Sequence, residues 1–130
     1  MVNRLKEDGL YKEVRQQFLG RGVENFPEEY KNRFELVTAS GVWLKSHIPN
    51  TGYDDVYCAM KHNGYFVTAM RNSYWTEGEK EGYYDKLQSM IREGKFKLVH
   101  SEKLMRGYKG DEVGLFGVME STALVFQKIG

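Results

Sequence analysis

The chain has 130 residues, of which 41% are hydrophobic and 28% are charged, and its 19 basic and 18 acidic side chains leave a net charge of +1. These values are typical of a soluble globular protein, and the balanced charge excludes a global field that attracts nucleic acid or membrane surfaces. A chain of this length buries enough apolar surface to fold alone. We therefore expect residues 1–130 to form a single domain.

Cys58 is the only cysteine, so the sequence excludes an internal disulfide and a cysteine-based zinc site. The first residues lack the apolar run of a signal peptide, and no segment approaches the length of about 18 apolar residues that a membrane span needs. We expect a soluble, cytoplasmic protein with no membrane partner.

The first predicted element is a helix over residues 2–19. Leu10, Val14 and Phe18 recur in it at four-residue spacing, and Gly20 suits the position that follows a helix.

The next segment has two interpretations. Pro27 and the two acids after it fit the first turn of a helix over 27–38. Alternatively, residues 34–39 and 42–48 form a hairpin. We favour the helix, followed by a strand over 42–48.

The pair Asn63-Gly64 lies between two apolar runs, 55–61 and 65–71. Asn-Gly in this setting is the strongest local signal for a two-residue β-hairpin turn, because that turn needs positive φ angles. The sequence therefore predicts an aromatic-rich antiparallel hairpin with Asn63-Gly64 at its tip.

The stretch Thr76-Glu77-Gly78-Glu79 matches the capping box that begins a helix, and apolar residues follow it at helical spacing up to Gly94. Strands are predicted over 95–100, 113–119 and 122–128, the last two joined by a turn at Glu120-Ser121. The predicted order is α-α-β-β-β-α-β-β-β. It describes an α+β domain with a mainly antiparallel sheet packed by helices.

A catalytic grouping is not evident in the sequence. His47, His62 and His100 are isolated, which argues against a metal site, and the predicted neighbours of Cys58 are apolar, which argues for a structural thiol. The acidic pairs, such as Asp54-Asp55, match no acid–base motif. The absence of such a grouping favours a protein that is not an enzyme.

Glycine-rich phosphate loops are also absent, since Gly20-Arg21-Gly22 does not match G-x-G-x-x-G. The order of elements resembles that of the N-acetyltransferases, in which a Q/R-x-x-G-x-G/A turn holds coenzyme A. The corresponding stretch here, residues 71–78, departs from that motif because it has one glycine beside an acidic residue. We expect no cofactor.

Aromatic side chains gather between residues 53 and 84, and interfaces between proteins are enriched in tyrosine and tryptophan. The sequence thus favours a non-catalytic binding protein of the inhibitor, adaptor or immunity type, such as phages and mobile elements encode. It would contact a protein partner, or a second copy of itself, through the aromatic hairpin. The expected partner-binding residues are Tyr57, Phe66, Arg71, Tyr74 and Trp75.

Two alternatives stay open. The first is a nucleic-acid-binding module that uses the locally basic segment 92–109, where cations and aromatic rings alternate. The second is a small enzyme or ligand-binding domain with a pocket between the sheet and its helices. The residues expected to contact nucleic acid are Arg92, Lys95, Lys97, Lys103, Arg106 and Lys109.

Overall fold

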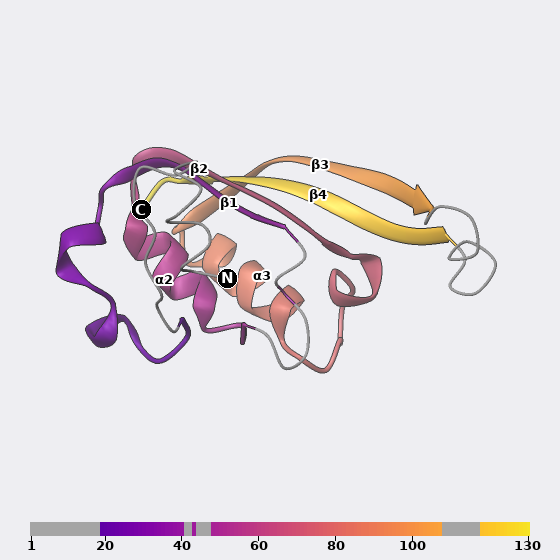
Figure 1. The fold of residues 1–130 in the computed structure, drawn as a ribbon, viewed down its shortest axis with the longest axis horizontal. Coiled ribbons are helices and arrows are strands. Elements are labelled where there is room, and N and C mark those ends of the chain that lie inside the picture. The colour runs from indigo at the N-terminus through magenta and orange to yellow at the C-terminus, as the bar shows by residue number, and fades with distance from the viewer. Residues whose placement is uncertain (1–18, 41–42, 44–47, 108–117) are drawn as a thin grey trace, which may run out of the picture.

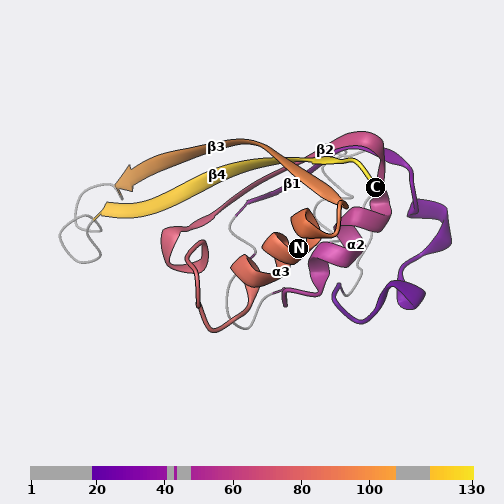
Figure 2. The ribbon, with the colours of Figure 1, turned by 180° about the vertical axis from the view of Figure 1, so that it is seen from behind.

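A computed structural model describes residues 19–40, 43, 48–107 and 118–130. Within these ranges, helices α2 and α3 lie together on one side of a sheet of four strands (Figure 1, and from behind in Figure 2). The described chain also contains three short 3-10 helices, two before β1 and one after β2. The elements are η1 (Val23–Asn25), η2 (Glu28–Tyr30), β1 (Phe34–Ser40), α2 (Gly52–Ala59), β2 (Met60–Arg71), η3 (Asn72–Tyr74), α3 (Tyr83–Arg92), β3 (Phe96–Gly107) and β4 (Val118–Lys128).

The strand order is β1-β2-β4-β3, with β1 parallel to β2 and β4 antiparallel to both of its neighbours. The prediction of an α+β domain with a mainly antiparallel sheet is therefore wrong, because the described sheet is mixed and begins with a parallel pair. A parallel pair needs a crossover connection, usually a helix. Here α2 lies in the connection between β1 and β2.

The predicted hairpin at Asn63-Gly64 does not form. Both residues lie inside the continuous strand β2, where Asn63 takes a φ of 67°. The pairing with β1 shifts around them, from Phe34 opposite Met60 to Leu36 opposite Tyr65, so the extra residues form a bulge. A Cβ atom on Gly64 would lie 2.9 Å from the carbonyl oxygen of Lys61, which explains the glycine.

The stretch predicted as the first hairpin strand is instead mostly helix α2. Its buried residues Tyr53, Val56 and Ala59 recur at helical spacing and face the sheet. Asp54 and Asp55 lie in the first turn, where carboxylates complement the helix dipole.

The helix predicted over 27–38 is wrong, because η2 ends at Tyr30 and β1 begins at Phe34. The alternative interpretation correctly placed a strand at 34–39. Its second strand, 42–48, lies mostly outside the described residues. So does the helix predicted over 2–19, apart from residue 19.

The third predicted helix exists, but it begins at Tyr83 rather than Thr76, and the hydroxyl of Thr76 donates to the carbonyl oxygen of Asn72 instead of capping it. The predicted apolar stripe is confirmed, since Tyr83, Leu87 and Met90 are buried. Gly94 follows the helix with a φ of 77°.

The last two described strands form one long antiparallel ladder. Strand β4 passes through Glu120-Ser121 without a turn, so the hairpin predicted there is wrong, while the strands predicted over 95–100 and 122–128 lie within this ladder apart from Lys95. Residues 113–117 lie outside the described residues.

The core lies between the sheet and the two helices and is rich in aromatic rings. Trp43 is at its centre, 4.1 Å from the ring of Tyr53, and its indole N–H donates to the hydroxyl of Thr68 at 2.8 Å. The buried apolar cluster contains Trp43, Tyr53, Val56, Met60, Phe66, Met70, Tyr83, Leu87, Met90, Phe96, Leu124 and Phe126.

Candidate functional site

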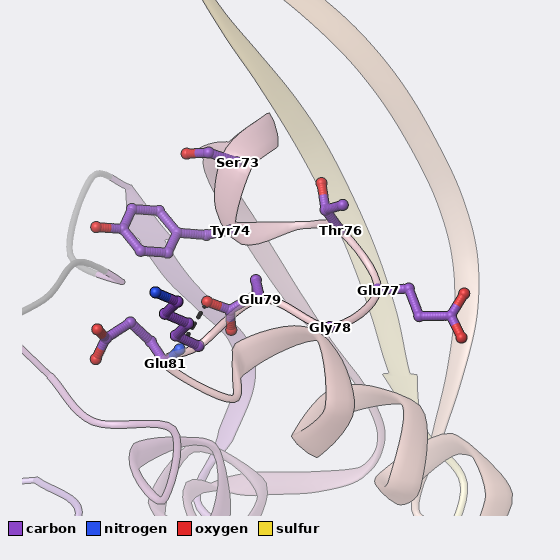
Figure 3. A pocket seen from close by; sticks show the side chains of 8 residues that line it. Ser73, Tyr74, Thr76, Glu77, Gly78, Glu79 and Glu81 are labelled. Atoms are coloured by element: carbon purple, nitrogen blue, oxygen red, sulfur yellow. Dashed lines mark hydrogen bonds between the residues drawn. The ribbon is translucent and has the colours of Figure 1, made fainter.

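A pocket of about 560 Å³ lies at the carboxyl end of β2, in the segment that joins β2 to α3 (Figure 3). In open sheets with parallel strands, ligands bind in the crevice outside the carboxyl ends of those strands. Strand β2 belongs to the one parallel pair among the described strands, so the pocket occupies that position. Its lining residues are Ser73, Tyr74, Thr76, Glu77, Gly78, Glu79, Lys80 and Glu81.

Asn72 holds the beginning of the pocket segment against the sheet. Its side-chain oxygen accepts the hydroxyl proton of Thr122 on β4. Its carbonyl oxygen accepts hydrogen bonds from the backbone N–H of Trp75 at 3.0 Å and from the hydroxyl of Thr76 at 2.6 Å. One asparagine therefore fixes the turn that follows β2.

The end of the segment is held by Glu79 and Asn50. Glu79 accepts the backbone N–H groups of Glu81 and Tyr83, and that of Tyr83 is a donor of the first helical turn, which has no partner within the helix. The side-chain amide of Asn50 donates to the carbonyl oxygen of Glu81 at 2.9 Å. A Cβ atom on Gly82, whose φ is 80°, would lie 2.7 Å from that amide nitrogen, so glycine is required at the close approach.

Two tyrosine rings connect the pocket to the core. The rings of Tyr74 and Tyr83 meet edge to face at 5.5 Å, and the phenol of Tyr83 donates to the carbonyl oxygen of Ile48 at 2.6 Å. Burial, and to a lesser extent the nearby Glu81, Tyr74 and Glu79, together raise the pKa of Tyr83 to about 12.

The pocket is acidic. Among the described lining residues, Glu77, Glu79 and Glu81 oppose Lys80. Figure 3 shows the ring of Tyr74 and the carboxylates of Glu79 and Glu81 on the same side of the segment, while Glu77 points away from them. Carboxylates beside an aromatic face suit a cationic ligand.

A metal site is not supported: in the ranges 19–40, 43, 48–107 and 118–130, no three His, Cys, Asp or Glu residues are placed to hold an ion. Cys58 is half-buried, and burial raises its thiol pKa, which disfavours the reactive thiolate. His100 is exposed, 3.8 Å from the carboxylate of Glu102.

The structure separates the five residues predicted to bind a partner. Arg71, Tyr74 and Trp75 lie at the pocket end of β2, with the indole of Trp75 at 4.9 Å from the ring of Tyr84. Phe66 is 0% exposed and packs in the core. Tyr57 is half-buried in α2, beneath the ammonium of Lys128.

The basic residues predicted to contact nucleic acid are also dispersed. Arg92 ends α3, and Lys95 lies between α3 and β3, with its ammonium 5.9 Å from the ring of Tyr57. Lys97 pairs with Gln127 and Lys103 with Thr122, so these two lysines face opposite sides of the sheet. Arg106 belongs to β3, and Lys109 lies outside the described residues.

Neither helix in the described part of the chain has the length and apolarity that crossing a membrane requires.

Several solved structures share this fold at low sequence identity, whereas no protein-family model and no curated protein matches the chain. A putative methyltransferase from Bacillus halodurans superposes with a TM-score of 0.60 at 11% identity over 98% of this chain and 77% of that chain. A SAM-dependent methyltransferase from Methanosarcina mazei gives 0.57 at 12% identity over 97% and 76%. The [4+2]-cyclase SpnF gives 0.59 at 12% identity over 99% of this chain and 62% of its own.

These likenesses establish a Rossmann-like fold of the methyltransferase type, with a mixed sheet. They overturn the prediction of a non-catalytic inhibitor, adaptor or immunity protein that acts through an aromatic hairpin, because the three solved structures named above are two methyltransferases, one of them putative, and a cyclase. The alternative of a small enzyme or ligand-binding domain agrees better with them.

The pocket was not predicted from the sequence. Its signal was the alternation of Glu77, Glu79 and Glu81 shortly after a strand, in a stretch that the capping-box interpretation assigned to a helix. Asn72 gave no local signal, because its partner Thr122 is 50 residues away along the chain.

Proposed function

We propose that this chain acts in S-adenosylmethionine-dependent methyl transfer, and that the pocket at the carboxyl end of β2 is its ligand site. The observation that supports this most is the position of the pocket, beside the parallel pair β1–β2 of a methyltransferase-type fold. A cytoplasmic location belongs to the proposal, in keeping with the free thiol of Cys58.

The residues of the pocket fit the methyl donor in size and charge. A volume of about 560 Å³ lies within the usual range of small-molecule sites. S-adenosylmethionine carries a sulfonium and an ammonium cation, which the carboxylates of Glu79 and Glu81 attract, and its adenine can lie against the ring of Tyr74. When bound, it supplies an electrophilic methyl group. The chain's own part is to orient the ligand and to hold its cationic end.

A second candidate is that the pocket takes the methyl acceptor instead. The stretch Ser73–Glu81 contains one glycine, Gly78, and Gly20-Arg21-Gly22 precedes η1 rather than following a described strand. Sites in which the backbone approaches an anionic group of a ligand closely use several glycines. An acceptor with a protonated amine fits the acidic lining without that requirement.

Titration calorimetry with S-adenosylmethionine and S-adenosylhomocysteine tests the proposal. S-adenosylhomocysteine lacks the sulfonium charge of S-adenosylmethionine, so we expect it to bind more weakly. If neither compound binds at millimolar concentration while small organic amines do, the acceptor site is supported. If neither the nucleosides nor the amines bind, the proposed function is wrong.

A further inference from the structure

The edge of the sheet formed by β1 is a second feature, separate from the pocket. Among the described residues β1 pairs on one side alone, with β2, and no described strand pairs with its other side. An edge strand presents a row of unpaired backbone N–H and C=O groups that can accept another strand.

Large apolar side chains are exposed at this edge and on the neighbouring strand. Leu36 is 58% exposed and Phe34 is 36% exposed, and Tyr65, the cross-strand neighbour of Leu36 on β2, is 42% exposed. These three belong to the few large apolar residues of the described chain that are exposed, and they lie at one corner of the sheet. Exposed apolar side chains that gather at one place mark an interaction surface.

The strand carries few of the devices that protect edges, although its pairing with β2 includes the bulge at Asn63-Gly64. Its sequence, Phe34 to Ser40, contains no lysine and no proline, and its one charged residue is Glu35. Glu35 lies 3.8 Å from the ammonium of Lys61 within the same chain, so its charge is already partly balanced. The β3 edge at the other side of the sheet differs, since it carries Lys97 and Lys103 and a bulge next to Val99.

We propose that β1 pairs with β1 of a second copy of this chain, antiparallel and around a twofold axis at Val37. In this register Val37 lies opposite its own copy, and Leu36 lies opposite Thr38. Glu35 then faces Ala39, so the two copies oppose no like charges. A twofold contact uses the same surface on both copies, and it closes the edge rather than leaving it free to grow.

Analytical ultracentrifugation of the full chain tests this inference. The wild type sediments as a dimer at micromolar concentration, and Leu36→Lys raises the dimer dissociation constant at least about tenfold, because it places two cations diagonally across the axis and removes an apolar contact with Thr38 of the other copy. Val99→Lys is the matched control: Val99 is 48% exposed on the opposite edge, so this variant keeps the wild-type constant. Circular dichroism checks that both variants are folded.

A cross-link tests the register. In a Cys58→Ser background, Val37→Cys places two thiols on the axis, at a Cβ separation of about 4.5–5.5 Å that mild oxidation can bridge with little adjustment. Val99→Cys in the same background gives no dimer band. A wild-type monomer throughout the concentration range, a dimer that Leu36→Lys leaves intact, or equal cross-linking at both positions overturns the inference.

Discussion

The carboxylate of Glu79 accepts the backbone N–H of Tyr83, so the side chain that begins α3 also lines the pocket. Its other oxygen accepts the N–H of Glu81 at 2.9 Å. The fold and the candidate site therefore share one residue, and removing it should affect both.

Replacing Glu79 with alanine should lower the free energy of unfolding by about 1 kcal/mol, the usual cost of a lost helix cap. Glu77→Ala is the matched control, because Glu77 is exposed and points away from the helix beginning. Its effect should stay within about 0.5 kcal/mol. Urea denaturation measures both, and equal effects of the two variants would show that Glu79 is not a cap.

Because Trp43 makes both a buried hydrogen bond to Thr68 and ring contacts, its replacement by phenylalanine should destabilise the fold less than its replacement by alanine. Trp43→Phe keeps an aromatic ring but removes the indole donor to Thr68, and should cost about 1–2 kcal/mol. Trp43→Ala also leaves a cavity among the rings of Tyr53, Phe66 and Tyr83, and should cost about 3–5 kcal/mol. Unfolding in urea, followed by far-UV circular dichroism, should rank the proteins in this order. A phenylalanine variant as stable as the wild type contradicts the hydrogen-bond assignment, and one as unstable as the alanine variant contradicts the contribution of the ring packing.

Replacing Lys128 should lower the stability of the fold more than replacing an exposed lysine. Its side chain is buried, and its ammonium donates to the side-chain oxygen of Asn32 and to the carbonyl oxygens of Tyr57 and Met60. Burial lowers its pKa. Lys128→Met leaves these acceptors without their donor and should destabilise the protein by about 2–3 kcal/mol.

The control for this variant is Lys97→Met, on the adjacent strand β3, where the side chain is exposed. Its unfolding free energy should stay within about 0.5 kcal/mol of the wild type. A thermal melt in which the two variants coincide would rule out the ammonium as a tie between α2 and β4.

Tyr83 predicts the response to alkaline pH. Its pKa is about 12 in the folded protein against an ordinary value of 10.0 for tyrosine, so the native state retains a proton that the unfolded chain loses. Stability should therefore fall as the pH rises from 10.0 towards 12. Tyr83→Phe removes the ionisable group, and its unfolding free energy should fall less steeply across that window, although its baseline is lower.

The sequence predicted elements whose signals are local. The spacing of Tyr83, Leu87 and Met90 identified α3, and the strand predicted over 122–128 lies within β4, although the turn predicted before it does not form. A local signal was ambiguous where the same backbone conformation occurs in two kinds of structure. The positive φ of Asn63 suits a hairpin turn, but here it serves a bulge inside β2.

The remaining features depend on contacts between distant parts of the chain. The parallel pairing of β1 with β2 joins residues such as Val37 and Phe66, and no periodicity reports it. The capping box predicted at Thr76 was wrong for a similar reason. Asn72 accepts a hydrogen bond from Thr122, and this contact holds the chain in a turn. The helix starts only at Tyr83, whose backbone N–H donates to Glu79. The pocket is formed by the residues before α3, which starts at Tyr83, seven residues later than the predicted start at Thr76.

The most direct test of the central claim, that the pocket at the carboxyl end of β2 binds S-adenosylmethionine, is calorimetry on the wild type, Glu81→Gln and Glu77→Gln. The two variants change the total charge equally, but the carboxylate of Glu81 lies on the side of Tyr74 whereas that of Glu77 points away. We predict that Glu81→Gln weakens binding about fivefold, equivalent to roughly 1 kcal/mol between partly exposed charges, and that Glu77→Gln leaves it unchanged. Equal binding by all three proteins would contradict the assignment of the site.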